Sequence, residues 1–529
     1  MLERLEILMQ DNSELNVSTI RPISRQLAAR VATMADSLSG FYPYDFYHSL
    51  SAVERYNIRS ILMNNIEWVN DSSRFSSKKP LWNTFYKTPA DFFSVSEKDF
   101  FLAVNPVIQQ QQSIETGNGQ RVFLNTKGIT VRGQIAKRLG FDAYITDNQE
   151  RGPEFFQQWV NTYNAVPGVG FYKPFKSTAV DYIDARGSIH FSAAKYFRFQ
   201  FGYDKNFIGN GYRSLMLSDF GNSYLFGRIN TSIWKLQYNN LFMELVPQTI
   251  AINAGNKILD KKYAVIHHLS VNITPAINIG LFEAVVFGRK NRFELSYLNP
   301  VIFLRASEQQ NGSADNAIIG FDFKANTGHT GQLYGQIILD EFLLKEAKSR
   351  NGWWGNKFGF QLGAKYIDAF ELKNVDLQVE MNIVRPFTYS HFDSVANYTH
   401  YNQPLAHPLG ANFLEVIGLL NYQVRPKWTV KGRFIFWKQG LDTANRNFGG
   451  NIFKLNSTRS GDYGYKLANG LGLRGINTSA LVSYEWKENL FLEGSLMFRH
   501  AKPDNASANN SLMLTAGLRL NMFRREYDY

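Results

Sequence analysis

The most constraining feature of this sequence is a strict alternation of side chains in residues 511–523, which read SLMLTAGLRLNMF. One face of this segment carries only apolar side chains: Leu512, Leu514, Ala516, Leu518, Leu520 and Met522. The opposite face is more polar and includes Arg519 and Asn521. A period of two residues is that of a β-strand with two chemically different faces.

The same alternation recurs upstream, from about residue 98 onward. Clear examples are residues 197–204, 357–366, 376–383, 427–436, 480–486 and 490–499. In these segments the polar face is often charged and needs water, whereas the apolar face needs lipid or a packed core. Most are near the length of a tilted membrane-spanning strand, about 9–11 residues. We therefore predict an all-β fold, a large antiparallel transmembrane β-barrel of about 18 strands with a hydrated lumen.

Composition agrees with a barrel of this kind. The chain has 529 residues, and we find no apolar run near the roughly 18 residues that a spanning helix needs. Aromatic residues make up 15%, which suits the aromatic girdles of a membrane barrel. A large aromatic-rich soluble β-protein is the alternative that composition alone leaves open.

Charge and cysteine content narrow the functional classes. The absence of cysteine excludes disulfides, thiolate metal sites and cysteine nucleophiles. The net charge of +12 is spread along the strands, which fits a solvated lumen and loops facing anionic glycans better than a nucleic-acid groove. A merely solubilising excess of positive charge explains it equally well.

The first residues, MLERLE, show no basic region followed by an apolar core, as a signal peptide would. An outer-membrane protein of a diderm bacterium is exported, so we expect the leader to have been removed from this chain.

Residues 1–95 follow a different pattern. Ser24 is placed to cap a helix that runs to about residue 38, and Ser51 with Glu54 forms a capping-box pattern. We predict a small helical N-terminal periplasmic or plug element in residues 1–95 and the barrel in residues 96–529. Long irregular stretches are predicted to be loops, some folded into the lumen: residues 148–177, 205–222, 344–355, 387–410, 440–472 and 501–510.

Two loops combine aromatic rings with charged and hydrogen-bonding side chains, a mixture that suits a glycan or an anionic group. The candidate glycan-binding residues are Asp204, Lys205, Asn206, Tyr212, Arg213, Tyr398, His400, Tyr401 and His407. The same side chains also suit loops that simply pack against the barrel wall. Arg305, Asp315 and Asn316 form a predicted polar network of the lumen, in which Arg305 and Asp315 can pair.

Catalytic and metal chemistry find little support. His391, His400 and His407 lie near Asp393, but their spacing matches no compact metal-ligand motif. No phosphate-binding GxxxxGK[ST] loop and no HExxH motif occurs. We therefore predict no catalytic residue, no metal site, no cofactor and no enzymatic activity.

Several stretches resemble the Wzi-type capsule-assembly outer-membrane proteins, and most of all their gliding-motility RemB-type branch. They are residues 198–222, 294–317, 334–342, 353–370 and 398–413, together with residues 2–25, which are similar to the mature start of that family. The resemblance implies a barrel of about 18 strands with a helical N-terminal element on the periplasmic side. The strand pattern supports the barrel independently, whereas capsule and gliding come only from the resemblance.

The resemblance implies a non-enzymatic outer-membrane barrel that binds or organises surface capsular polysaccharide. The expected partners are surface polysaccharide or lipopolysaccharide and outer-membrane lipid, with other outer-membrane proteins or lipoproteins as further candidates and no nucleic acid. One alternative is an accessory subunit of an outer-membrane complex for gliding motility, adhesin export or barrel assembly. Another is a diffusive porin.

Overall fold

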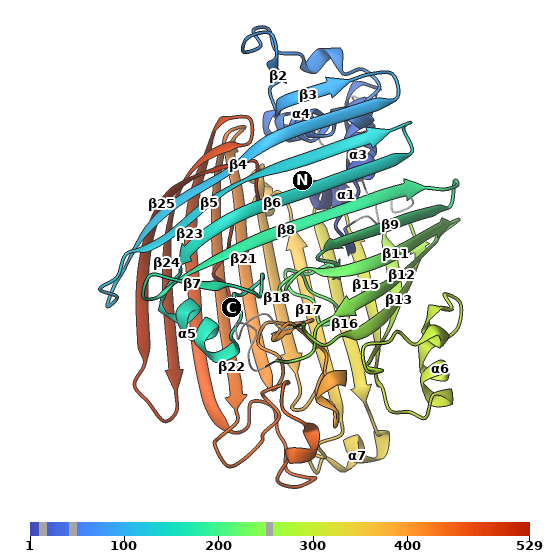
Figure 1. Ribbon diagram of the computed structural model, residues 1–529, viewed down its shortest axis with the longest axis vertical. Helices are drawn as coiled ribbons and strands as arrows, with labels where there is room; N and C mark the ends of the chain where they lie inside the picture. Colours follow the sequence, from blue (N-terminus) through green and yellow to red (C-terminus); the bar gives the residue numbers. More distant parts are fainter. Residues whose placement is uncertain (10–17, 42–49, 250–257) are drawn as a thin grey trace.

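The computed structural model describes residues 1–9, 18–41, 50–249 and 258–529, and it shows a closed antiparallel barrel of 18 strands (Figure 1). The barrel strands are β4 (Phe100–Glu115), β5 (Val122–Ile135), β6 (Leu139–Arg151), β8 (Ala179–Ser192), β9 (Phe197–Asp204), β11 (Tyr224–Ile233), β12 (Leu236–Leu245), β13 (Lys262–Thr274), β14 (Ile277–Phe287), β15 (Asn316–Thr327), β16 (Gly331–Glu341), β17 (Lys357–Tyr366), β18 (Val375–Val384), β21 (Phe413–Arg425), β22 (Trp428–Leu441), β23 (Leu471–Lys487), β24 (Leu490–Pro503) and β25 (Asn509–Leu520). The predicted fold class and strand number are confirmed.

The last strand closes the ring. β25 pairs with β4 in antiparallel register, from Met513 opposite Glu115 to Leu520 opposite Ile108. Leu512 and Leu514 of β25 point outward and are exposed, whereas Met513 and Thr515 point inward and are buried. The alternation read from the sequence therefore separates an apolar outer wall from a more polar inner wall.

Short strands and helices occur in addition to the barrel strands. The short strands are β1 (Ile20–Arg21), β2 (Phe85–Thr88), β3 (Asp91–Ser96), β7 (Lys173–Phe175), β10 (Phe207–Ile208), β19 (Thr399–His400) and β20 (Gln403–Pro404). The α-helices are α1 (Leu2–Met9), α3 (Arg25–Phe41), α4 (Ala52–Asn64), α5 (Glu154–Tyr163), α6 (Leu304–Gln310) and α7 (Leu344–Ser349). None of the described helices is long and apolar enough to cross a membrane.

The two ends of the barrel differ in how the strands are connected. At one end the strands are joined mostly by short turns, such as residues 136–138, 234–235 and 426–427, and we call it the short-turn end. The other, long-loop end carries long connections that include α5, α6 and α7 (Figure 1).

The N-terminal helices lie at the short-turn end, inside the barrel wall (Figure 1). Tyr56 of α4 donates a hydrogen bond to Glu485 of β23 at 2.7 Å, and the carbonyl of Leu8 in α1 lies 2.8 Å from Nδ1 of His329. The capping box predicted at Ser51 and Glu54 is confirmed at the start of α4. These contacts fix the N-terminal segment to the barrel at this end, and we call the described residues before β4 the N-terminal plug.

Buried ion pairs fasten this plug. Arg4 pairs with Glu54 at 3.0 Å, with Asp368 at 2.6 Å and also with Asp376. Glu6 of α1 pairs with Lys324 of β15, and both side chains are fully buried. Because an uncompensated buried charge is costly, each of these groups depends on its partner.

We expect Arg4→Met to loosen α1, because the substitution leaves three acidic side chains without their shared cation. Removing one partner of a buried pair costs about 3–5 kcal/mol. Hydrogen exchange of residues 2–9 and 52–64 measures the effect, and it should become much faster while exchange in β21–β24 stays unchanged.

The matched control is Arg74→Met, because Arg74 and Asp36 form an exposed pair at 2.9 Å. Such surface pairs contribute about 0–1 kcal/mol, so the control should leave exchange nearly unaltered. Equal exchange in both variants would contradict the role given to Arg4.

Candidate functional site

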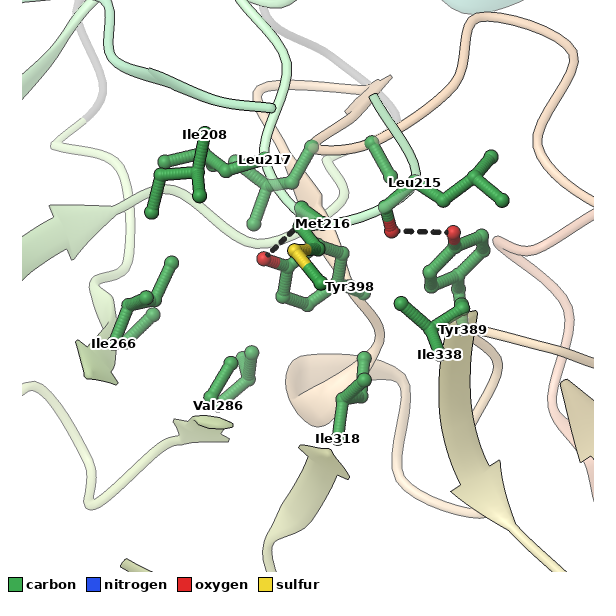
Figure 2. Close-up of a cluster of buried hydrophobic side chains, with 14 of the residues drawn as sticks. Ile208, Leu215, Met216, Leu217, Ile266, Val286, Ile318, Ile338, Tyr389 and Tyr398 are labelled. Atoms are coloured by element: carbon green, nitrogen blue, oxygen red, sulfur yellow. Dashed lines mark hydrogen bonds between the residues drawn. The ribbon is translucent and has the colours of Figure 1, made fainter. Parts of the chain in front are cut away.

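A layer of chain fills the lumen at the long-loop end. Segments 205–223 and 385–412 meet there, and Figure 2 shows Leu215, Met216 and Leu217 at the centre of the apolar cluster that they form with the inner wall. Tyr389 and Tyr398 donate hydrogen bonds from their hydroxyls to the carbonyls of Leu215 and Met216, each at 2.7 Å. This cluster explains why the two loops fold inward: the strand residues around it are apolar too. They are Ile266, Val286, Ile318 and Ile338.

Five of the nine predicted glycan-binding residues are buried in or beside this layer. They are Asn206, Arg213, Tyr398, His400 and His407. Their observed contacts are internal, so they have no free surface for a ligand in this structure. We therefore assign these five residues to the packing of the loops against the barrel wall, and not to direct contact with a glycan.

His400 illustrates this packing role. Its Nδ1 accepts a hydrogen bond from the backbone N–H of Val246 at 3.0 Å, and its Nε2 donates to the carbonyl of Ser223 at 3.1 Å. Burial lowers the pKa of His400 to about 3, because desolvation disfavours the charged ring. The neutral imidazole, with a hydrogen bond at each ring nitrogen, thus joins its own loop to the segments of Val246 and Ser223.

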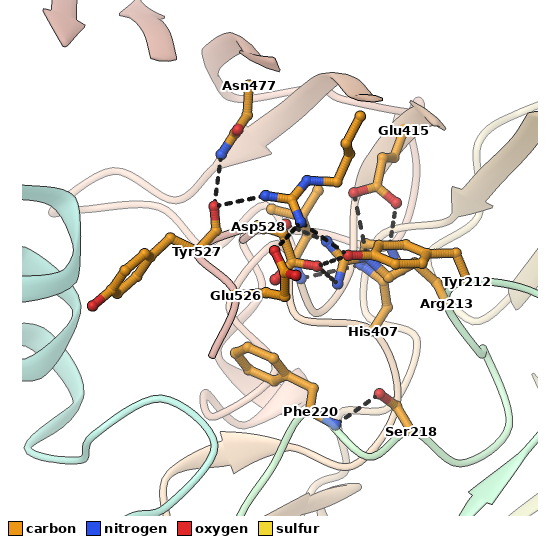
Figure 3. Close-up of polar contacts among 12 residues, drawn as sticks. Tyr212, Arg213, Ser218, Phe220, His407, Glu415, Asn477, Glu526, Tyr527 and Asp528 are labelled. Carbon is orange, nitrogen blue, oxygen red and sulfur yellow. Dashed lines mark hydrogen bonds and ion pairs between the residues drawn. The ribbon is translucent and has the colours of Figure 1, made fainter. Parts of the chain in front are cut away.

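A charged network joins this layer to the C-terminal residues, which turn back into the lumen (Figure 3). Arg213 pairs with Asp528 at 3.0 Å, and His407 lies 2.6 Å from Glu415. Arg433 of the inner wall pairs with Glu526 at 2.7 Å. Burial by itself raises the pKa of Asp528, but Arg213 and Arg433 hold it below its usual value.

The other four predicted residues, Asp204, Lys205, Tyr212 and Tyr401, keep part of their surface exposed. Lys205 follows β9 and enters the lumen. Its pKa falls to about 7, first because burial disfavours the charged amine and second because Arg186 repels it. These four are the predicted residues that remain available to a ligand.

The predicted lumen network of Arg305, Asp315 and Asn316 is not formed. Arg305 pairs with Glu308 at 2.7 Å within α6, and Asp315 pairs with Arg289 at 2.6 Å. Both lie in a loop outside the barrel wall. Only Asn316 faces the lumen, where its side-chain amide donates to the carbonyl of Ala396 at 2.9 Å. The sequence shows the charges but not the side of the wall on which the loop folds.

A cluster of partly exposed aromatic and charged side chains lies at the long-loop end. It consists of Trp353, Trp354, Arg459, Asp462 and Tyr463, and we call it the tryptophan platform. The guanidinium of Arg459 lies 3.9 Å from the ring centroid of Trp354, which is close enough for a cation–π interaction. Arg459 also pairs with Asp462 at 2.7 Å, and Tyr463 is 57% exposed.

Backbone hydrogen bonds between two loops build this platform. The N–H of Trp354 donates to the carbonyl of Asp462, and the N–H of Tyr465 donates to that of Gly352, each at 2.9 Å. Gly352 has a φ of +71°, and a Cβ there would lie 2.8 Å from the nitrogen of Tyr465. The close approach therefore needs glycine at this position.

None of the platform residues was among the predicted site residues. A signal was present in the sequence: two adjacent tryptophans directly follow the turn residues Asn351-Gly352 in a predicted loop. Among the described residues, no group of three or more histidine or acidic side chains is placed to hold a metal ion.

The fold and its internal plugs define a class, that of 18-strand β-barrels resembling bacterial outer-membrane proteins. A solved structure covering 98% of both chains is similar, with a TM-score of 0.56 and 15% identity. It is Wzi from Escherichia coli, described as an outer-membrane protein involved in group 1 capsule assembly and as a carbohydrate-binding β-barrel. OprD from Pseudomonas aeruginosa is less similar, with a TM-score of 0.43 and 11% identity over 79% of this chain and 95% of OprD. No protein-family profile matches the sequence, and no curated protein matches it.

We expect Lys205 to react with acylating reagents at neutral pH faster than an ordinary lysine, whose pKa is about 10.4. With a pKa of about 7, much of its amine is neutral and nucleophilic at pH 7.5. Mass spectrometry of acetylated peptides over a pH series measures this, with the exposed Lys466 as the comparison. Equal rates at the two lysines would show that the lumen does not desolvate Lys205.

Proposed function

We propose that the protein is a non-enzymatic outer-membrane barrel that binds surface polysaccharide at its long-loop end. The observation that carries the proposal is the tryptophan platform, whose side chains are partly exposed, set on a fold like that of a carbohydrate-binding barrel. We place the long-loop end outside the cell and the short-turn end in the periplasm. Residues 1–95 then form a periplasmic plug for the barrel of residues 96–529.

The chemistry of the platform suits a sugar. The C–H faces of a sugar ring are apolar and stack on aromatic rings, here those of Trp353 and Tyr463. Arg459 and Asp462 lie beside the rings and supply hydrogen bonds to hydroxyl groups, and Arg459 also attracts a carboxylate. The partly exposed residues Asp204, Lys205, Tyr212 and Tyr401 are a second set of candidate contacts, further into the lumen.

We propose organisation of a capsular polysaccharide as the specific role, and an accessory role in a gliding, adhesin-export or barrel-assembly complex as its alternative. Stable co-purification of other membrane proteins in mild detergent, without bound glycan, would favour the alternative. A diffusive porin is disfavoured, because the N-terminal helices cross one end of the lumen and segments 205–223 and 385–412 cross the other.

The test is the double substitution Trp353→Ala with Tyr463→Ala. An aromatic contact contributes about 0.5–1.5 kcal/mol, so losing two should weaken binding by roughly tenfold. The affinity of the purified protein for surface polysaccharide extracted from its own source measures the effect by calorimetry.

The matched control is Trp82→Ala, because Trp82 is 79% exposed but directly precedes β2, which lies at the short-turn end (Figure 1). It should bind polysaccharide as the unaltered protein does. If the double variant also bound normally, the platform would not be the site, and no binding by the unaltered protein would overturn the proposed function.

A further inference from the structure

The loop between β14 and β15, residues 288–315, lies against the outer face of the barrel, and we call it the outer-wall cap (Figure 1). Ala264 and Ile266 of β13 belong to the lumenal cluster, so the alternating Val265 and His267 face outward. Val265 packs with Val285, Phe287, Tyr297 and Leu304 in a separate buried cluster. The cap therefore covers a part of the wall that lipid would otherwise contact.

Polar side chains lie under this cap. Asn240, His267 and Glu283 stand side by side on β12, β13 and β14, because the strand register pairs each with the next. The cap bonds to two of them: Asn240 donates to the carbonyl of Pro300 at 3.1 Å, and the N–H of Leu304 donates to Glu283 at 2.8 Å. His267 lies 2.9 Å from Glu283. Polar groups on a membrane-facing wall need such cover, since hydrocarbon offers no hydrogen bonds.

The outer side of the cap is apolar. Leu295 is 72% exposed, Val301 is 84% exposed and Phe303 is 51% exposed, with Leu298 and Ile302 between them also exposed. No charged residue occurs from Leu295 to Leu304. Ile319 of β15, which pairs in register with Glu283, is an exposed apolar residue of the neighbouring wall. The cap thus lies at a level where the barrel meets hydrocarbon.

A basic edge borders this apolar surface. Arg289 is held by Asp315, to which the hydroxyl of Tyr297 also donates at 2.7 Å, so the base of the cap is closed. Lys290 and Arg292 are exposed and have no ion-pair partner within the described part of the chain. Two unpaired cations therefore stand next to an exposed apolar segment.

We propose that the outer-wall cap binds a phosphorylated glycolipid of the outer leaflet, of the lipopolysaccharide type. The acyl chains lie on Leu295, Val301 and Phe303, and Lys290 with Arg292 binds the headgroup phosphates. Clustered cations at a membrane surface attract anionic headgroups, and an adjacent apolar segment fits the attached chains. This inference rests on the proposed outer-membrane location but not on polysaccharide binding at the tryptophan platform.

The test measures deep-rough lipopolysaccharide, which lacks long glycans, bound to the purified full-length protein in detergent. Each basic side chain near an anionic lipid surface strengthens binding to that surface. The double substitution Lys290→Glu with Arg292→Glu should therefore weaken lipopolysaccharide binding on the order of tenfold. The matched control is Lys137→Glu with Arg138→Glu. These two exposed basic residues lie in a short turn at the opposite end of the barrel. The control should retain full binding, and so should the Trp353→Ala, Tyr463→Ala variant.

Any of three results would overturn the inference. Equal loss in the cap variant and in the Lys137, Arg138 control would show unspecific attraction to charge, and equal competition by phosphatidylglycerol would show that no glycolipid is selected. A photoreactive residue at Val301 gives an independent readout in whole cells. A lipopolysaccharide adduct supports the site, whereas an adduct with another protein replaces the lipid by a protein partner. Heat-modifiable migration on gels confirms that each variant is folded.

Discussion

Closure of β25 onto β4 is the constraint on which the rest of the structure depends. A closed ring pairs the backbone groups of every barrel strand with a neighbour, so no open sheet edge faces the surroundings. Closure also fixes the two faces of each strand for its whole length. An apolar side chain can then point only to the outer wall or to whatever fills the lumen.

A ring of 18 strands encloses more space than its own side chains fill, so the lumen has to be wet or occupied. In this protein several segments that lie far apart in the sequence occupy it. The N-terminal plug is held by buried ion pairs such as Glu6 with Lys324, whereas the long-loop layer has an apolar centre around Met216. The C-terminal residues link that layer to the wall through Asp528 and Arg213. Both buried ion pairs and apolar clusters therefore hold these segments inside the barrel.

Much of the barrel could be predicted because its signals are local. A two-residue period in 511–523 and the capping box at Ser51 depend on near neighbours only. The sites were harder to predict than the barrel, because they join residues that are distant in the sequence. Arg459 meets Trp354 only when two loops pair, and Tyr398 is buried only because segment 205–223 folds onto it. A candidate list drawn from side-chain chemistry cannot distinguish a loop that binds a ligand from one that fills the lumen.

The side on which a loop folds does leave a trace in the strands that it covers. Along most of the barrel the apolar positions alternate, but β14 ends in Ala284-Val-Val-Phe287, where every residue is apolar and buried. Such a run is typical of a strand with protein on both faces. Here Ala284 and Val286 contact the lumenal layer, whereas Val285 and Phe287 contact the outer-wall cap. A local loss of alternation within a barrel strand therefore marks the place where one loop enters the lumen and another covers the outer wall.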